Sequence, residues 1–307
     1  MVPHVKPTSR PVTPTPRVLC VGLATVDIIQ SVDALPTANE KVVAREFLIA
    51  SGGPAANGAV AVARCGAAVD LVTALPDHPL SGAVVQDLAA CAVGVTIAGQ
   101  YNGPPVTATI LVTHGTGERA VVSPTSAAGS ITLTRTLPRV DTYASVLMDG
   151  YFPTLGLPLA REARQRGIPV ILDAGSFKLH TDDAVRAADC VVASADFSPP
   201  GIGGSPEEVF AFLAAAGVPY AAITRGADSV LYRTPSGAGE VPVPAVAVVD
   251  TLGAGDFFHG ALAAIVAREG LDEARFARQL AQASAVAGES LGTFGTRAWL
   301  TTPARAR

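Results

Sequence analysis

The sequence predicts an α/β fold: a doubly wound, mostly parallel sheet flanked by helices, with a small β-sheet lid. Short apolar runs alternate with helix-periodic segments along most of the chain, which is the rhythm of a parallel sheet. The apolar runs are nearly continuous, as in strands buried on both faces. With 307 residues and 49% hydrophobic content, the chain can bury a large core.

Composition and charge exclude several classes of function. The net charge is −4 and the 22 basic residues are scattered, so we expect no nucleic-acid partner. No apolar run approaches the roughly 20 residues that span a bilayer, and no signal peptide is evident, so we expect no membrane association and a cytoplasmic protein. The four cysteines lie far apart without metal-ligand spacing, which favours buried thiols and no structural metal.

The chain begins with a polar segment and then a buried strand. Residues 1–16 contain five prolines and little that could pack, so we expect a disordered tail. Residues 18–23 form an apolar strand, and Asp27 follows it. Ligands gather at the carboxyl ends of strands in open α/β sheets. Asp27 is therefore a candidate for holding substrate hydroxyls, with a turn or cap carboxylate as the alternative.

Two extended segments, 33–50 and 101–127, interrupt the α/β rhythm. Thr107–Val112 and Arg119–Val122 flank a glycine-containing turn and predict a hairpin. We expect these segments to form one small sheet, and the segments 17–32, 51–100 and 128–307 to form the α/β core. The alternative is an edge extension of the main sheet.

A glycine pair precedes the first predicted helix, 54–65. Pro54 suits the first helical position and Gly66 lies just past the last. Gly52 and Gly53 allow a ligand to approach the backbone closely, and Asn57 in the first turn offers both a donor and an acceptor to a hydroxyl.

The remaining elements continue the alternation of strand and helix. Ser205 and Glu208 form a capping box that opens one of the helices. The predicted strands are 69–74, 145–148, 170–172, 190–193, 221–224, 230–232 and 241–249, and the predicted helices are 79–92, 157–165, 182–188, 206–216 and 272–287.

The most informative stretch is the glycine-rich turn 249–260, which runs into an apolar helix ending near Glu269. Gly253 and Gly255 allow successive amides to face one side, and the first helical turn leaves N–H groups that suit phosphate oxygens. Asp256 lies in that first turn, and Asp250 precedes it by six residues. The pattern predicts an anion site with a base beside it, and simple capping of the helix dipole is the alternative.

These residues resemble the signatures of the ribokinase-like (PfkB) carbohydrate kinases. Asp250-Thr251-x-Gly253-Ala254-Gly255-Asp256 resembles the second signature, and Gly52, Gly53 and Asn57 resemble the first. Val21-Gly22 and Asp27 are also similar to the residues near the start of the family's sequences, and the resemblance covers about residues 17–300. It implies a ribokinase-like fold, a lid that closes over the sugar, and a homodimer through paired lids that would cover Val43, Phe47, Ile110 and Val112.

The resemblance implies a kinase that moves the γ-phosphoryl group of ATP to a primary hydroxyl of a small sugar. Asp256 would take the hydroxyl proton and the turn Gly253-Ala254-Gly255 would hold the developing charge. Asp27, Gly52, Gly53 and Asn57 would bind the sugar. Thr224, Gly226, Thr251 and Gly292 would contact the nucleotide with its Mg²⁺, and Asp250 with the loop 288–295 would hold a monovalent cation such as K⁺.

The chain departs from the family pattern in places. Ser229 replaces a glycine usual near Thr224, and Ser194-Ala195-Asp196-Phe197 replaces an N-x-x-E motif that helps to organise the metal. The motifs are closest to ketohexokinase-like and sulfofructose kinase-like members, which favours a ketose or furanose acceptor. Two alternatives stay open: a nucleoside kinase of the same fold, and a nonenzymatic sugar-binding regulator. No Walker-type lysine motif occurs.

Overall fold

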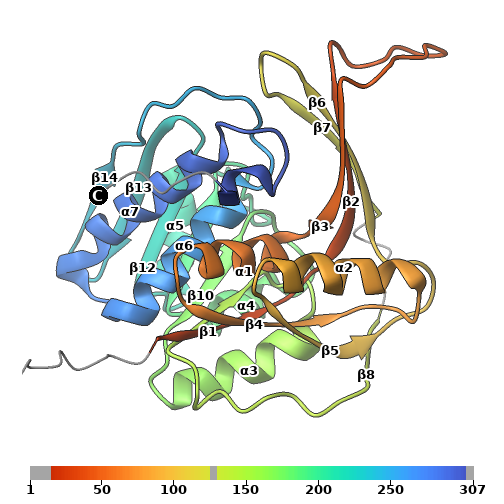
Figure 1. Ribbon diagram of the computed structural model, residues 1–307. Helices are drawn as coiled ribbons and strands as arrows, with labels where there is room; N and C mark the ends of the chain where they lie inside the picture. The colour runs from red at the N-terminus through yellow and green to blue at the C-terminus, as the bar shows by residue number, and fades with distance from the viewer. Residues whose placement is uncertain (1–14, 125–129, 302–307) are drawn as a thin grey trace, which may run out of the picture.

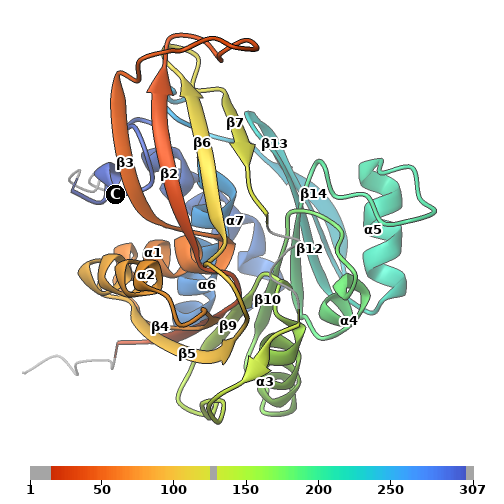
Figure 2. The same cartoon turned by 90° about the vertical axis from the view of Figure 1, so that its right-hand side faces the viewer.

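A computed structural model describes residues 15–124 and 130–301. A large twisted sheet forms the centre of the molecule, helices cover both of its faces, and a small sheet projects from one side (Figures 1 and 2). This confirms the predicted α/β class with a lid. The prediction of a disordered tail at 1–16 falls almost entirely outside the described residues.

The large sheet has ten strands in the order β14-β13-β12-β11-β10-β9-β1-β4-β5-β8. Its strands from β12 to β5 run parallel, and β13, β14 and β8 are antiparallel additions at the two ends. The bounds are β1 Arg17–Val21, β4 Ala68–Ala74, β5 Gly94–Gln100, β8 Thr132–Leu133, β9 Ser145–Met148, β10 Val170–Ala174, β11 Cys190–Ser194, β12 Tyr220–Arg225, β13 Asp228–Thr234 and β14 Gly237–Val241.

The helices form two layers, one on each face of the large sheet. The bounds are α1 Pro54–Arg64, α2 Pro79–Ala90, α3 Pro153–Gln165, α4 Thr181–Arg186, α5 Pro206–Ala215, α6 Ala254–Glu269 and α7 Glu273–Ser290. Successive strand residues alternate between the layers: Val18 and Cys20 pack with α1, α6 and α7, whereas Leu19 and Val21 pack with α3, α4 and α5. This arrangement explains why the strands have near-continuous apolar runs.

Most predicted elements are present, with two corrections. The predicted strand 241–249 is wrong, because β14 ends at Val241 and residues 242–249 run without strand pairing. Those residues are apolar but include two prolines, which remove backbone donors. Strand β5 was not predicted, although it pairs with β4. The capping box is confirmed: Ser205 Oγ accepts from the Glu208 N–H, and the Glu208 carboxylate accepts from the Ser205 N–H.

The small sheet has the order β3-β2-β6-β7. Its strands are β2 Thr25–Val32, β3 Glu46–Gly52, β6 Thr107–Thr113 and β7 Arg119–Val122. The predicted hairpin is confirmed by the antiparallel pairing of β6 and β7. The predicted core segment 17–32 needs correction, because β2 is a central strand of the small sheet and carries Asp27 on it. The pattern of apolar residues in β2 suits a strand of either sheet, so the sequence pattern does not show to which sheet β2 belongs.

One face of the small sheet, here called the inner lid face, packs on the chain's own core. Ile29, Ile110 and Val112 are buried there. They pack against Leu252 of the glycine turn and against Phe294 of the loop that follows α7. Ile110 and Val112 are therefore unavailable to a second subunit, contrary to the expectation that paired lids would cover them. The opposite face, here called the outer lid face, exposes Phe47, Ile49 and Val122 by 61%, 54% and 73%.

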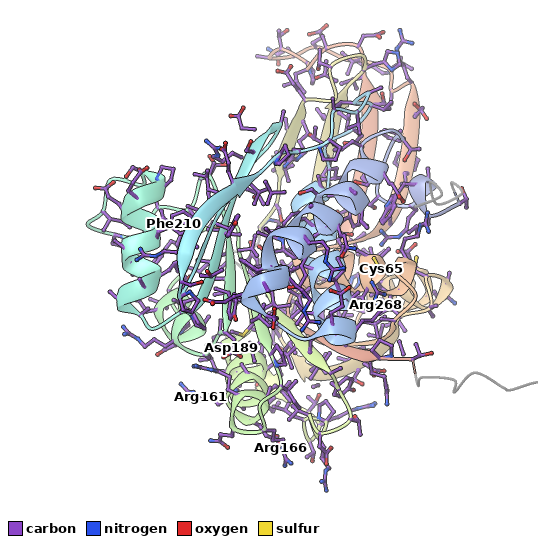
Figure 3. The ribbon with its side chains drawn as sticks, turned by 90° about the vertical axis from the view of Figure 1, so that its left-hand side faces the viewer. Cys65, Arg161, Arg166, Asp189, Phe210 and Arg268 are labelled. Atoms are coloured by element: carbon purple, nitrogen blue, oxygen red, sulfur yellow. The ribbon has the colours of Figure 1, made fainter. Side chains whose placement is uncertain are left out.

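Helices α1 and α6 pass each other in close backbone contact. A Cβ built on Gly260 would lie 2.0 Å from the carbonyl oxygen of Gly58, closer than any real contact. At their other ends, Arg268 donates from Nη1 to the Cys65 carbonyl at 2.8 Å (Figure 3). Because Asn57 and Asp256 sit in the first turns of these two helices, this crossing fixes how near the two side chains lie.

Replacing Gly260 with alanine should disrupt that crossing. We expect Gly260→Ala to lower the free energy of unfolding by about 1 to 3 kcal/mol or more, because the neighbouring atoms are backbone and must shift. Gly82→Ala is the matched control, since Gly82 is also helical but a Cβ there meets nothing within 4 Å. The control should raise the stability by about 0.5 to 1 kcal/mol. Urea unfolding measures both, and equal effects would contradict the close crossing.

Candidate active site

Acidic side chains gather at the carboxyl edge of the large sheet. Asp149 follows β9, Asp173 lies in β10, and Asp256 lies in the first turn of α6, which packs on β9 and β10. Asp27 approaches from β2 of the lid, and all but Asp256 are buried. The carboxyl ends of parallel strands are where open α/β sheets bind ligands, so this edge is the candidate site.

The glycine turn opens α6 with unsatisfied amides. Gly253 is the N-cap and adopts a left-handed conformation with φ 76°, which suits glycine. The N–H of Phe257 bonds to the Gly253 carbonyl, and no described residue accepts from the amides of Gly255 and Asp256. Gly255 is exposed and a Cβ there would meet open space. The turn therefore presents N–H donors and the positive end of a helix dipole to the opening, which suits phosphate oxygens.

Asn57 and Asp256 meet directly across the two helices. The Asn57 side chain donates from Nδ2 to Asp256 Oδ2 at 2.8 Å. Loss of water raises the pKa of Asp256 to about 7, with the charge of Asp173 as the second cause, and the Asn57 hydrogen bond acts in the opposite direction. A carboxyl with a pKa near 7 is well matched to proton transfer at neutral pH.

Asp27 forms a second polar contact point on the lid side. It accepts a hydrogen bond from Thr25 Oγ1 at 2.6 Å, and burial raises its pKa to about 6. A Cβ on Gly52 would lie 1.9 Å from the Asp27 carboxylate, so the glycine is needed for the close packing of β3 against this side chain. The Oδ1 atom of Asn57 is buried without a hydrogen-bond partner among the described residues, which leaves an acceptor for a ligand hydroxyl.

Asp149 organises the loops around the site. Its carboxylate accepts from the N–H groups of Leu23 at 2.8 Å, Tyr151 at 2.9 Å and Ala55 at 3.2 Å. Burial raises its pKa to about 6. The bond to Ala55 holds the first turn of α1, where the sequence supplies no side-chain cap. Asp149 thereby fixes the glycine pair and Asn57 relative to the sheet.

Asp250 ties the glycine turn to the carboxyl-terminal loop. Its side chain is buried and accepts from the N–H of Leu252 and the N–H of Gly295, both at 2.8 Å. No ion pair involves it among the described residues. In the same loop the Thr293 hydroxyl is buried without a hydrogen-bond partner. A buried carboxylate and a hydroxyl without a partner are oxygen ligands of the kind that a monovalent cation takes.

The lid hairpin contacts the glycine turn through Thr251. Arg119 of β7 donates from Nη1 to Thr251 Oγ1 at 2.7 Å, and that hydroxyl donates to the Gly117 carbonyl at 3.0 Å. On the other side, Arg297 donates to Asp87 at 2.8 Å and to the Ser51 carbonyl at 2.7 Å. The lid is thus held at both of its edges in the structure.

Two of the residues predicted to contact nucleotide lie farther along the sheet, whereas Thr251 lies in the glycine turn. Thr224, the penultimate residue of β12, pairs with Ser194 of β11, and its hydroxyl donates to the Ala193 carbonyl at 3.3 Å. Gly226 follows with φ 63°, and Gly292 lies in the exposed loop after α7. No direct hydrogen bond joins these residues to Asp27, Asn57 or Asp256 in the described chain. In the sheet, Thr224 of β12 lies two strands beyond Asp173 of β10.

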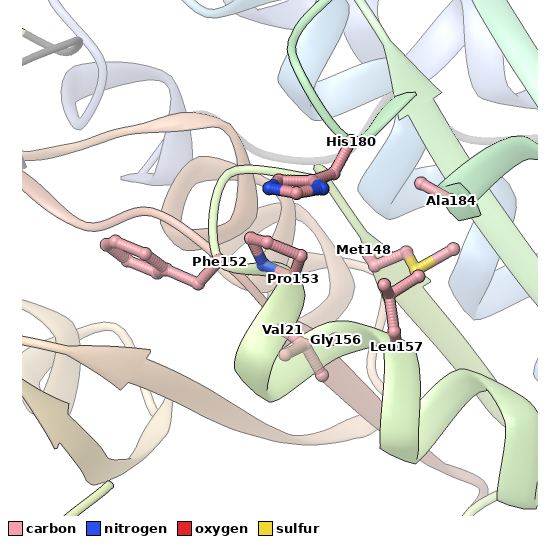
Figure 4. A pocket seen from close by; sticks show the side chains of 9 residues that line it. Val21, Met148, Phe152, Pro153, Gly156, Leu157, His180 and Ala184 are labelled. Atoms are coloured by element: carbon pink, nitrogen blue, oxygen red, sulfur yellow. The ribbon is translucent and has the colours of Figure 1, made fainter. Parts of the chain in front are cut away.

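A small apolar cavity lies beneath the same edge of the sheet (Figure 4). Val21, Met148 and Phe152 line it with Pro153, and the imidazole of His180 lies above Pro153. None of the four carboxylates lines this cavity, so it is separate from the candidate site.

Several site residues were not predicted. Asp149 directly follows a buried strand and Asp173 is the penultimate residue of another, and the same rule that selected Asp27 could have selected them. His259, which lies near Asp173, and Arg119 and Arg297, which are distant in sequence, gave no signal. Phe197 stands where a metal-organising carboxylate is usual, and it is buried with Phe177 and Phe212, so it offers no ligand.

Comparisons with known proteins identify a family and similar folds. The family model described as pfkB family carbohydrate kinase matches residues 15–303. A ribokinase from Bacillus subtilis (strain 168) is 29% identical, over 92% of this chain and 97% of its own length. A solved structure from Agrobacterium tumefaciens with a provisional ribokinase assignment has a TM-score of 0.80 and 26% identity, over 92% of each chain. Arabidopsis thaliana ribokinase, complexed with ribose and ATP, has a TM-score of 0.69 at 20% identity, over 94% and 99% of the two chains.

The protonation of Asp256 can be measured without any substrate. Difference infrared spectra between wild type and Asp256→Asn should show a carboxylic-acid band that is lost with a midpoint near pH 7. Asn57→Ala removes the hydrogen bond that stabilises the carboxylate, so the midpoint should rise by about one pH unit. A midpoint near pH 4 in the wild type, or a downward shift in Asn57→Ala, would contradict the described environment.

Proposed function

Because the chain belongs to the PfkB family of carbohydrate kinases, we propose that it transfers the γ-phosphoryl group of ATP to a primary hydroxyl of a small ketose or furanose sugar. The observation that carries the proposal is the direct contact between Asn57 and Asp256, with Asp27 on the lid side of the same opening. The base Asp256, the amide oxygen of Asn57 and the carboxylate of Asp27 could thereby bind hydroxyl groups of one sugar. The alternative of simple helix capping does not explain a carboxyl held by a side chain from another helix.

In the proposed reaction Asp256 accepts the proton of the attacking hydroxyl. A pKa near 7 leaves enough of the unprotonated carboxylate at neutral pH and a good driving force for proton transfer. The N–H groups of the turn Gly253-Ala254-Gly255 and of Asp256 would face the negative charge on the transferred group. Positioning and charge stabilisation supply most of the acceleration in phosphoryl transfer.

The acceptor is held by the sugar-side residues. Asp27 accepts from sugar hydroxyls, the free Oδ1 of Asn57 accepts from another, and Gly52 with Gly53 allows close approach. Hydrogen bonds to charged groups contribute about 1.5 to 3 kcal/mol each. Ribose, the sugar in the similar Arabidopsis structure, is a reasonable first acceptor to test.

The nucleotide would bind farther along the sheet than the acidic residues. Thr224, Gly226 and Gly292 would contact ATP. Thr251, which is hydrogen-bonded to the lid hairpin, would connect the nucleotide site to the lid. Among residues 15–124 and 130–301, no group of three or more His, Cys, Asp or Glu side chains is arranged to hold a metal ion. Mg²⁺ would be bound mainly by phosphate oxygens, with Ser194, the last residue of β11, and Asp196 just after it as its protein neighbours. The ion would neutralise phosphate charge.

A monovalent cation such as K⁺ would bind near Asp250 and Thr293. The carboxylate has remaining lone pairs beside its two N–H partners, and the Thr293 hydroxyl is free to coordinate. The ion would stiffen the loop that Asp250 joins to the glycine turn.

A homodimer through the outer lid face completes the proposal, and the use of ATP suits a cytoplasmic enzyme. Phe47, Ile49 and Val122 lie on one exposed face of the small sheet, where a second lid would remove them from water. No described helix is long and apolar enough to span a bilayer.

Replacing the base tests the proposed chemistry. Asp256→Asn should lower kcat with ribose and ATP by about 10²- to 10⁴-fold, because it removes general-base catalysis. The affinity for ATP, measured by calorimetry, should change little. Asp182→Asn, an exposed carboxylate on α4, is the control and should behave like wild type. An Asp256→Asn enzyme within threefold of wild type would refute the assignment.

Charged substitutions test the dimer. Phe47→Glu and Val122→Glu should shift the light-scattering mass from dimer to monomer and weaken the apparent sugar affinity, because the outer lid face then repels its copy. Leu179→Glu, at a residue 90% exposed outside the lid, should leave the mass unchanged. A wild-type protein that is monomeric at micromolar concentration and fully active would rule the dimeric lid out.

A further inference from the structure

His259 is a buried imidazole on the same side of α6 as Asp256, one turn further along. Its side chain is 5% exposed. Its Nε2 lies 3.2 Å from the carbonyl oxygen of Val192 in β11, and its Nδ1 lies 3.3 Å from Oδ2 of Asp173 in β10. Nothing in the proposed reaction uses this residue.

The hydrogen-bonding partners restrict the protons that His259 carries. A carbonyl oxygen only accepts, so Nε2 must carry a proton and donate it to Val192. In a neutral imidazole, Nδ1 would then have a lone pair that faces the lone pairs of the Asp173 carboxylate. Nδ1 has no hydrogen-bond partner among the described residues other than this ion-pair contact. A second proton between Nδ1 and Oδ2 removes the repulsion, because charged, buried groups need a partner.

We propose that Asp173 and His259 share one proton and form a net-neutral pair, which limits the negative charge around the base Asp256. This inference rests on the proposed function, in which Asp256 takes the proton of the acceptor. His259 is a positioning residue, because it acts on Asp256 through Asp173, and no hydrogen bond or ion pair joins it to Asp256 among the described residues.

The charges around Asp256 show why such a pair matters. Asp256 faces Asp173 from β10, Asp27 from β2 and Asp149 after β9, and each of these carboxylates raises its pKa when charged. A proton shared between Asp173 and His259 would remove the Asp173 contribution. Burial, and after it the charges of Asp149, Asp173 and Asp256, raise the pKa of Tyr151, also after β9, to about 12. Asn57 from α1 is neutral, and Lys178, in the loop before α4, lies over the Tyr151 ring and lowers the pKa of Asp149. His259 faces only Asp173 and the Val192 carbonyl as polar partners.

Two variants separate a net-neutral pair from an ionised Asp173 beside a neutral imidazole. Asp173→Asn replaces the carboxylate with an amide that donates to Nδ1 of a neutral His259, so the pair stays neutral. His259→Gln keeps an N–H that reaches toward Val192 but leaves the Asp173 charge without its proton. If the pair is net-neutral, only His259→Gln should change the pKa of Asp256 strongly. If Asp173 is ionised beside a neutral imidazole, Asp173→Asn should change that pKa more than His259→Gln does.

The pH dependence of kcat/KM with ribose, ATP and Mg²⁺ is the first readout. In His259→Gln the acidic limb, which reports the ionisation of Asp256, should move up by about one pH unit. In Asp173→Asn it should stay within about 0.3 pH unit of wild type, since a neutral pair replaces a neutral pair. A downward shift in Asp173→Asn with no shift in His259→Gln would overturn the proposal. A purely structural role would lower kcat or stability in both variants and leave the limb in place, which also overturns it.

Nitrogen-15 NMR of the imidazole rings gives a readout that needs no activity. The His259 signals are assigned by their absence from His259→Gln, since the chain has only 5 histidines. At pH 7.5 we expect both ring nitrogens of His259 to carry proton-bound shifts in wild type, and Nδ1 alone to become an unprotonated acceptor in Asp173→Asn. A wild-type Nδ1 with the shift of a free acceptor would overturn the shared proton. If the NMR result holds but no acceptor is phosphorylated, the proposed function fails and the pair stands.

Discussion

The hydrogen bond between Asn57 and Asp256 is the contact on which the site depends. It joins the first turns of α1 and α6, and these turns meet only because Gly58 and Gly260 let the two helices cross in backbone contact. Asp149 then fixes the first turn of α1 to the sheet through the Ala55 N–H. A packing constraint between two glycines therefore sets the distance between the Asn57 amide and the Asp256 carboxylate.

The small sheet belongs to this arrangement as much as the core does. Strand β2 carries Asp27 on the lid, and the inner lid face packs on Leu252 of the glycine turn. Thr251, one residue earlier, bonds to both Gly117 and Arg119 of the lid hairpin. A movement of the lid would therefore act on both Asp27, the carboxylate proposed to hold the acceptor, and the turn proposed to hold phosphate. This coupling gives a physical reason for water exclusion and phosphate binding to occur together.

Local patterns predicted the parts whose causes are local. The proline and glycine at the ends of α1, the capping box of α5 and the buried runs of the parallel strands all specify structure within a few residues. The candidate residues on the sugar side and in the glycine turn were selected from local patterns and from the family resemblance together, although Asp27, expected after a strand of the core, lies within β2 of the lid. Other features depend on tertiary contacts instead. These are the place of β2 in the small sheet, the burial of Ile110 and Val112, and the absence of strand pairing at residues 242–249. His259 and Arg119 became interesting only when the fold brought Asp173 and Thr251 beside them.

The central claim is that the acidic edge of the sheet moves phosphate from ATP to a sugar hydroxyl. ADP release from ATP and Mg²⁺, measured with a panel of pentoses, ketoses and nucleosides and without any acceptor, tests it most directly. The account predicts that at least one sugar with a free primary hydroxyl raises ADP release by about 10²-fold or more over the acceptor-free rate. Stimulation by nucleosides alone would identify the related nucleoside kinase activity instead. A protein that binds ATP but is stimulated by no member of the panel would contradict the account.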